Sequence, residues 1–137
     1  MRWAYSSKGQ RVMKPAKKKK ILIVDDTEDI RELLAVLFRL RGYEPILATD
    51  GREALDRAAR CVPDLVLMDI CMPEMDGCQA TRRIHDIPYL SSVPVVAMSA
   101  HWARDWSEEA IDAGCAECVS KPLELERIDQ IISRYVH

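Results

Sequence analysis

Five side chains that are suited to chemistry each follow a short, mostly aliphatic segment: Asp25, Asp26, Asp69, Ser99 and Lys121. Clustered carboxylates repel one another and raise each other's pKa unless a cation lies among them. A hard divalent ion, most simply Mg²⁺, meets that need with one or two carboxylates and water. A further carboxylate can then attack a phosphoryl group whose oxygens are neutralised by the ammonium, the metal and the hydroxyl. The set predicts phosphoryl chemistry, provided that the fold brings these residues together.

The segments that precede these residues are typical of β-strands. The run 21–24 is short, aliphatic and β-branched, as in a strand buried on both faces. Pro45 weakens the second strand and predicts that it lies at an edge of the sheet. The predicted strands are 21–24, 43–48, 65–68, 93–98 and 116–120.

Helical periodicity occupies the segments between the strands. Thr27 is placed to cap the first helix, and Gly42 is placed to end it. Strict alternation of strands and helices predicts a parallel α/β sheet covered on both faces. The carboxyl ends of its strands would share one edge, where ligands bind in such folds. The other predicted helices are 51–60, 78–86, 103–113 and 125–135.

Charge divides the 137-residue chain into two parts. Residues 1–20 contain eight basic and no acidic residues, whereas the rest contains 12 basic and all 22 acidic residues. We predict a basic, disordered tail over residues 1–19 and one domain over residues 20–137. An acidic domain binds nucleic acid poorly, so only the tail is a candidate for that contact.

The location of the protein is indicated by what its sequence lacks. The longest aliphatic run, 21–24, is far short of a membrane helix, and the N-terminus has no apolar segment typical of a secretory signal. Five cysteines, an odd number, favour free thiols in a reducing compartment. We predict a cytoplasmic protein with no membrane partner.

Four motifs together resemble the receiver domain of two-component response regulators, over residues 19–137. They are Ile-Leu-Ile-Val-Asp-Asp at 21–26, Leu-Met-Asp-Ile-Cys-Met-Pro-Glu-Met-Asp-Gly at 67–77, Met-Ser-Ala at 98–100 and Ser-Lys-Pro at 120–122. The resemblance implies a flavodoxin-like, doubly wound (βα)5 fold. Its five-stranded parallel sheet would have the order 2-1-3-4-5, with helices on both faces.

The resemblance also implies the roles of the acidic residues. Asp69 would accept phosphoryl from a phosphohistidine on a histidine kinase or a histidine phosphotransfer protein. Asp26 and Asp69 would ligate Mg²⁺ through their side chains, and Asp25 would act mainly through water. The third protein ligand would be the backbone carbonyl of Cys71, not its thiol.

The same resemblance implies a phosphoryl-binding pair and a switch. Ser99, followed by Ala100, and Lys121, joined to Pro122 by a cis peptide bond, would bind the phosphoryl group. Phosphorylation would draw the Ser99 hydroxyl towards the acceptor. In typical members an aromatic residue three positions before the lysine then swings inward, but that position is Cys118 here. A thiol cannot fill and vacate a pocket as an aromatic ring does, so the usual coupling is in doubt.

Three further residues leave alternatives open. His101, two residues after Ser99, would position the water that hydrolyses the aspartyl phosphate, or it is an exposed loop histidine. Trp102 and Trp106 are four residues apart on the predicted fourth helix, and form a docking patch or pack over the sheet edge.

Cys115 and Cys118 form a C-x-x-C pair without a second ligand pair. We interpret them as plain thiols that point to opposite faces of a strand.

The leading functional prediction is a phosphoacceptor receiver of a phosphorelay that signals through an unknown downstream protein, with no output domain in the chain. Such a domain is not an enzyme in the usual sense, because it catalyses only its own phosphorylation and slow dephosphorylation. The alternative is a phosphate-independent adaptor of the same fold, regulated by a partner or by thiol state. A haloacid-dehalogenase-type hydrolase does not fit, because residues 25–29 lack its D-x-D-x-T motif.

Overall fold

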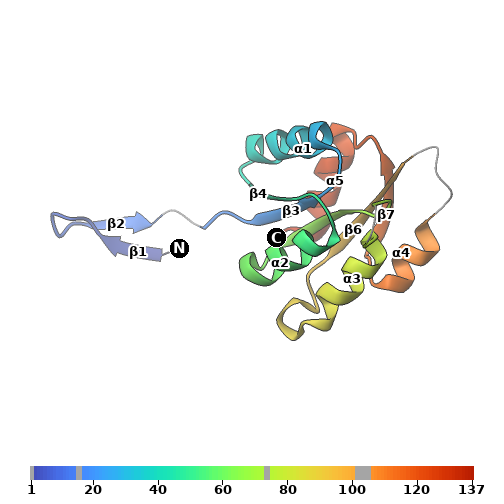
Figure 1. Cartoon of the computed structure of the whole chain (residues 1–137). Helices are drawn as coiled ribbons and strands as arrows, with labels where there is room; N and C mark the ends of the chain where they lie inside the picture. The colour runs from blue at the N-terminus through green and yellow to red at the C-terminus, as the bar shows by residue number, and fades with distance from the viewer. Residues whose placement is uncertain (1, 15–16, 73–74, 101–105) are drawn as a thin grey trace.

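The five central aliphatic segments form a parallel sheet in the computed structural model, which describes residues 2–14, 17–72, 75–100 and 106–137 (Figure 1). The strand order is β4-β3-β5-β6-β7, which is the predicted 2-1-3-4-5 when these five strands are numbered along the chain. The strands are β3 (Lys20–Val24), β4 (Glu44–Ala48), β5 (Leu65–Asp69), β6 (Val95–Ala100) and β7 (Glu117–Lys121).

In the described part of the chain, five α-helices cover the two faces of the sheet, as predicted. Helices α1 (Glu28–Leu40) and α5 (Leu125–Tyr135) pack on one face (Figure 1). The other face is covered by α2 (Gly51–Cys61), α3 (Gly77–Asp86) and α4 (Ser107–Ala113). Residues 103–105, which we predicted as the start of α4, lie outside the described residues. No helix in the described ranges combines the length and apolar character needed to cross a membrane.

One short helix was not predicted. The 3-10 helix η1 (Pro88–Leu90) follows α3 and spans a single turn. Three residues are too few to produce a periodic pattern in the sequence.

The core is divided into two layers by the alternation of side chains along the strands. Residues Ile21 to Val24 of β3 are fully buried, as are Leu65 to Met68 of β5. Alternate side chains of β3 enter the two different core clusters, because neighbouring residues of a strand point to opposite faces. Strand β4, which contains Pro45, lies at the sheet edge as predicted.

The start of α1 differs from the prediction. Thr27 stands at the N-cap, but its side chain makes no capping hydrogen bond. Its backbone N–H instead donates to Asp25 Oδ1 at 2.9 Å, so the carboxylate fixes the turn that leads into α1. The side chains of Asp50 and Asp76 do cap α2 and α3.

Part of the tail that we predicted to be disordered forms a hairpin in the structure. Strands β1 (Arg2–Tyr5) and β2 (Arg11–Lys14) pair antiparallel. Ser6 Oγ accepts two backbone N–H groups within the turn, and Gly9 adopts a φ of +76°, which favours glycine. Composition alone favoured disorder because it carries no information about this turn. The hairpin lies apart from the sheet in Figure 1.

Gly77 allows α3 to begin close to the end of β5, which gives the first prediction. A Cβ at this position would lie 2.5 Å from the Asp69 backbone oxygen and 2.7 Å from Ile70 Cα. Since both neighbours are backbone atoms, Gly77→Ala should lower the free energy of unfolding by about 1–3 kcal/mol in urea titrations. The control Gln79→Ala, at an exposed position of the same helix, should change it by less than about 0.5 kcal/mol. Equal stability of the two variants would contradict the close approach.

Candidate functional site

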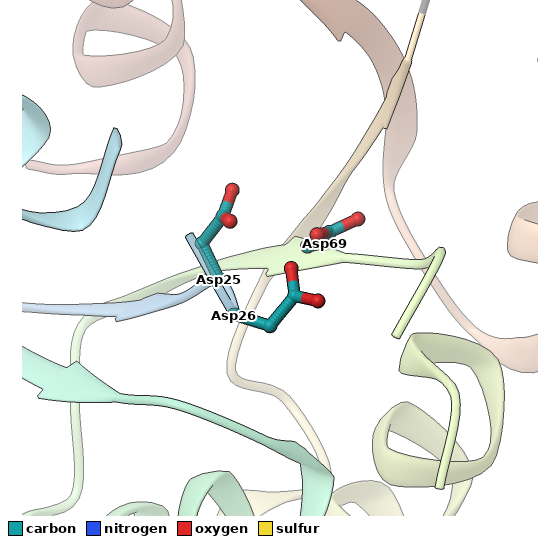
Figure 2. A group of neighbouring side chains, drawn as sticks. All are labelled: Asp25, Asp26 and Asp69. Carbon is teal, nitrogen blue, oxygen red and sulfur yellow. The ribbon is translucent and has the colours of Figure 1, made fainter. Parts of the chain in front are cut away.

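Three carboxylates meet where β3 and β5 end (Figure 2). Asp25 and Asp26 directly follow β3, and Asp69 is the last residue of β5. The parallel register pairs Val24 with Met68, so the residues that follow these two lie at the same level. One carboxylate oxygen from each aspartate lies within 4.8 Å of the others. The two strands therefore bring together acids that are more than 40 positions apart in the chain.

Lys121 supplies an ammonium group to this cluster. It is the last residue of β7, and its Nζ lies 2.6 Å from Asp25 Oδ2 and 3.1 Å from Asp69 Oδ2. Because β6 lies between β5 and β7, the lysine side chain extends across the end of β6, where the small residue Ala100 is its register partner. The lysine therefore joins the two acids that flank it into one ion-paired group.

Asp25 is fully buried, and its two oxygens have different surroundings. Oδ1 accepts the Thr27 N–H. Among the described residues Oδ2 accepts no hydrogen bond of ordinary geometry, although the Lys121 ammonium is beside it. Arg31 donates to the Asp25 backbone carbonyl at 2.7 Å, so its guanidinium holds the main chain rather than the carboxylate.

The pKa of Asp69 is raised above its ordinary value. Burial is the largest cause, and the charge of Asp25 adds to it. A hydrogen bond from the Cys71 N–H at 2.9 Å and the charge of Lys121 lower the pKa but do not offset the burial. The folded protein thus disfavours the charge on Asp69.

The pKa of Lys121 is also raised. Burial acts to lower it, but the close ion pair with Asp25 and the charge of Asp69 outweigh burial. The lysine therefore remains an ammonium at neutral pH, and one positive charge faces three acids.

The donor set fits a small hard cation. Three carboxylates with oxygens within 4.8 Å of one another, one of them with a buried and poorly satisfied oxygen, provide the oxygen ligands that Mg²⁺ prefers. Asp26 is exposed, so this edge of the cluster is open to water. Cys71 follows β5, and its backbone N–H donates to Asp69 Oδ1.

Ser99 and Cys118 lie on the neighbouring strands β6 and β7 and contact each other. Ser99 lies on β6 and is buried, and Cys118 Sγ lies 3.9 Å from Ser99 Oγ. Ser99 is the residue after Met98, which pairs in register with Asp69. Lys121 and Pro122 are joined by a cis peptide bond, as the resemblance implies.

The remaining sequence candidates have different outcomes. His101 and Trp102 lie outside the described residues. Trp106 is half-buried and packs against the core cluster beneath α2, α3 and α4. This agrees with the interpretation that it packs on the protein.

The prediction for the C-x-x-C pair is wrong in one respect. Cys115 and Cys118 contact the same core cluster, because Cys115 precedes β7 and so does not follow the alternation of that strand. Both are free thiols, and burial raises the pKa of Cys115 to about 11.

Sequence reasoning missed an apolar cavity beside the acids. Its volume is about 970 Å³, and Leu33, which borders it, is 58% exposed. The adjacent pair Leu33-Leu34 was a usable signal, because it widens the apolar stripe of α1 beyond the face that packs on the sheet. The lining residues are Asp26, Thr27, Ile30, Leu33, Leu34, Asp69, Cys71, Met98, Ala100, Trp106, Lys121, Pro122 and Leu123.

Known proteins are similar to this chain in sequence and in fold. A family model described as the response regulator receiver domain matches residues 21–133. The polar-differentiation response regulator DivK of Brucella anthropi is 36% identical over 118 residues, which cover 86% of this chain and 96% of DivK. The regulatory protein AtoC of Escherichia coli K12 is 39% identical over 115 residues, which cover 84% of this chain but only 24% of AtoC.

A solved structure agrees with the family match. The receiver domain of the sensor histidine kinase PA1611 from Pseudomonas aeruginosa, with a magnesium ion in its active-site cleft, superposes with a TM-score of 0.80 at 29% identity. The alignment covers 87% of this chain and 98% of that domain. With the family model matching most of the domain, this chain belongs to the receiver domains of two-component response regulators.

Proposed function

We propose that Asp69 accepts a phosphoryl group from a phosphohistidine on a histidine kinase or a histidine phosphotransfer protein. The observation that carries the proposal is the orientation of its carboxylate. Oδ1 is held by the Cys71 N–H, and Oδ2 lies 3.1 Å from the Lys121 ammonium. An oxygen placed beside a fixed cation is suited to attack a phosphorus whose oxygens need neutralisation.

The transfer exchanges one bond to phosphorus for another. A carboxylate oxygen of Asp69 forms the new O–P bond while the N–P bond of the phosphohistidine breaks. The departing imidazole keeps the electron pair and takes a proton from water. Lys121 then lies beside the negative phosphoryl oxygens, and the Ser99 hydroxyl donates to one of them.

Four residues would hold the metal. When bound, Mg²⁺ would supply positive charge at the transferring phosphoryl oxygens. Asp26 and Asp69 would bind it through carboxylates, Asp25 through water and Cys71 through its backbone carbonyl. The clustered oxygens support this assignment, as does the magnesium described for the PA1611 receiver domain.

The contact between Ser99 and Cys118 supports a modified switch. Movement of the Ser99 hydroxyl towards a phosphoryl group would break its 3.9 Å contact with the thiol. The change transmitted to β7 would then be the loss of a weak hydrogen bond rather than the swing of an aromatic ring. The same contact favours the second candidate, a phosphate-independent adaptor that responds to the state of Cys118.

The apolar cavity gives the phosphodonor a surface to dock on. Ile30, Leu33 and Leu34 of α1 line the cavity together with Leu123, and Asp69 is among the lining residues. A helix that carries the phosphohistidine could bury apolar side chains here while its imidazole faces the acceptor.

The first test of the phosphoacceptor is the mass of the intact protein after incubation with acetyl phosphate and Mg²⁺. We expect a single phosphoryl adduct that falls more than tenfold in EDTA and is absent from Asp69→Asn. Asp86→Asn, an exposed aspartate of α3, is the matched control and should keep the adduct. If the wild type gives no adduct and binds no beryllofluoride, the adaptor becomes the better account.

The docking surface is tested by measuring phosphoryl transfer to the chain from a phosphorylated histidine kinase that is active on the wild type. Leu33→Asp places a charge in the apolar cavity and should slow that transfer at least tenfold, with an unchanged rate from acetyl phosphate. Leu40→Asp, at a position 76% exposed and outside the cavity, should leave both rates unchanged. Equal slowing by the two variants would place the kinase on a different part of α1.

A further inference from the structure

The N-terminal hairpin presents two large aromatic side chains to solvent. Trp3 and Tyr5 are two residues apart in β1 and therefore share one face of the ribbon. Their side chains are 54% and 77% exposed. An isolated two-stranded hairpin is only marginally stable in water. A molecule that binds to this face would therefore stabilise the hairpin.

One guanidinium lies against the Trp3 ring, and further exposed basic residues flank the two strands in the sequence. The Arg11 guanidinium carbon lies 4.2 Å from the centroid of the Trp3 ring, and Arg11 is the register partner of Tyr5. Lys8 in the turn and the run 17–19 after β2 are exposed. Residues 1–20 hold eight basic residues and no acidic residue.

We propose that this hairpin is a binding site for single-stranded nucleic acid, a function separate from phosphoryl acceptance. Bases would stack on Trp3 and Tyr5, while the lysines and Arg11 neutralise the phosphates. Aromatic platforms bordered by cations are the usual means of binding single strands without sequence preference. The acidic residues of the chain all lie after position 20, so the polyanion is attracted to the hairpin and repelled by the domain.

An anionic membrane is the competing ligand, and the geometry disfavours it. Insertion would bury the Trp3 ring in the lipid interface together with the guanidinium that lies over it. Burial of that charge opposes insertion, and two aromatic rings offer little apolar area in return. A nucleic acid instead accepts the ring and the cation at the same site.

The test is the fluorescence anisotropy of a labelled 20-nucleotide oligothymidylate titrated with the full chain at several salt concentrations. The double variant Trp3→Ala, Tyr5→Ala should weaken binding about tenfold or more, as expected for the loss of stacked bases. The double variant Lys17→Ala, Lys18→Ala should also weaken binding. It should reduce the salt dependence of log K by about 0.7 for each phosphate that the chain no longer neutralises.

Two controls remove an aromatic ring and two positive charges from the domain. Tyr89→Ala removes an exposed ring of η1, and Arg82→Ala with Arg83→Ala removes two exposed charges of α3. Both should leave the affinity within twofold, and circular dichroism should show every variant folded. The proposal is overturned if Trp3→Ala, Tyr5→Ala binds as tightly as the wild type, or if a duplex binds as tightly as the single strand. Binding to phosphatidylserine vesicles without binding to the oligonucleotide would also overturn it.

Discussion

The carboxylates of Asp25, Asp26 and Asp69 lie within 4.8 Å of one another, and the Lys121 ammonium is the cation that the structure places among them. Like charges this close resist folding unless positive charge compensates them. Lys121 does so only in part, because its single positive charge faces three carboxylates. The negative charge that remains attracts a divalent cation. It also favours a reaction in which a carboxylate loses its charge on forming a bond.

The fold keeps this unfavourable group together by making its supports rigid. Strands β3 and β5 are buried on both faces, so the acids at their ends cannot move apart without disturbing both core layers. Gly77 lets α3 approach the backbone of Asp69 without a Cβ between them. Lys121 reaches the acids across β6 from β7, so the four strands β3, β5, β6 and β7 must be in register before the charges are balanced. Core packing thus supplies the stability that the site itself lacks.

The strand ends and the grouping of the acids were predictable, because aliphatic strands in a parallel sheet share one carboxyl edge. Other features depended on particular neighbours. Thr27 makes no capping hydrogen bond with its side chain, and its N–H donates to Asp25 instead. The position of Cys115 before β7 places it on the same side as Cys118. The cavity beside Leu33 forms only when α1 faces the residues that follow β7. The hairpin turn around Gly9 was not predicted, because the basic composition of the tail favoured disorder.

The most direct test of the charge balance is the free energy of unfolding of the wild type and Asp69→Asn, measured in EDTA and in MgCl₂. Because the pKa of Asp69 is higher in the folded than in the unfolded protein, its ionisation costs stability as pH rises between those two values. At neutral pH in EDTA the account predicts that Asp69→Asn is more stable than the wild type, with a difference that shrinks on acidification. Mg²⁺ should then stabilise the wild type more than the variant. A variant that is less stable in EDTA and gains as much from Mg²⁺ would contradict the account.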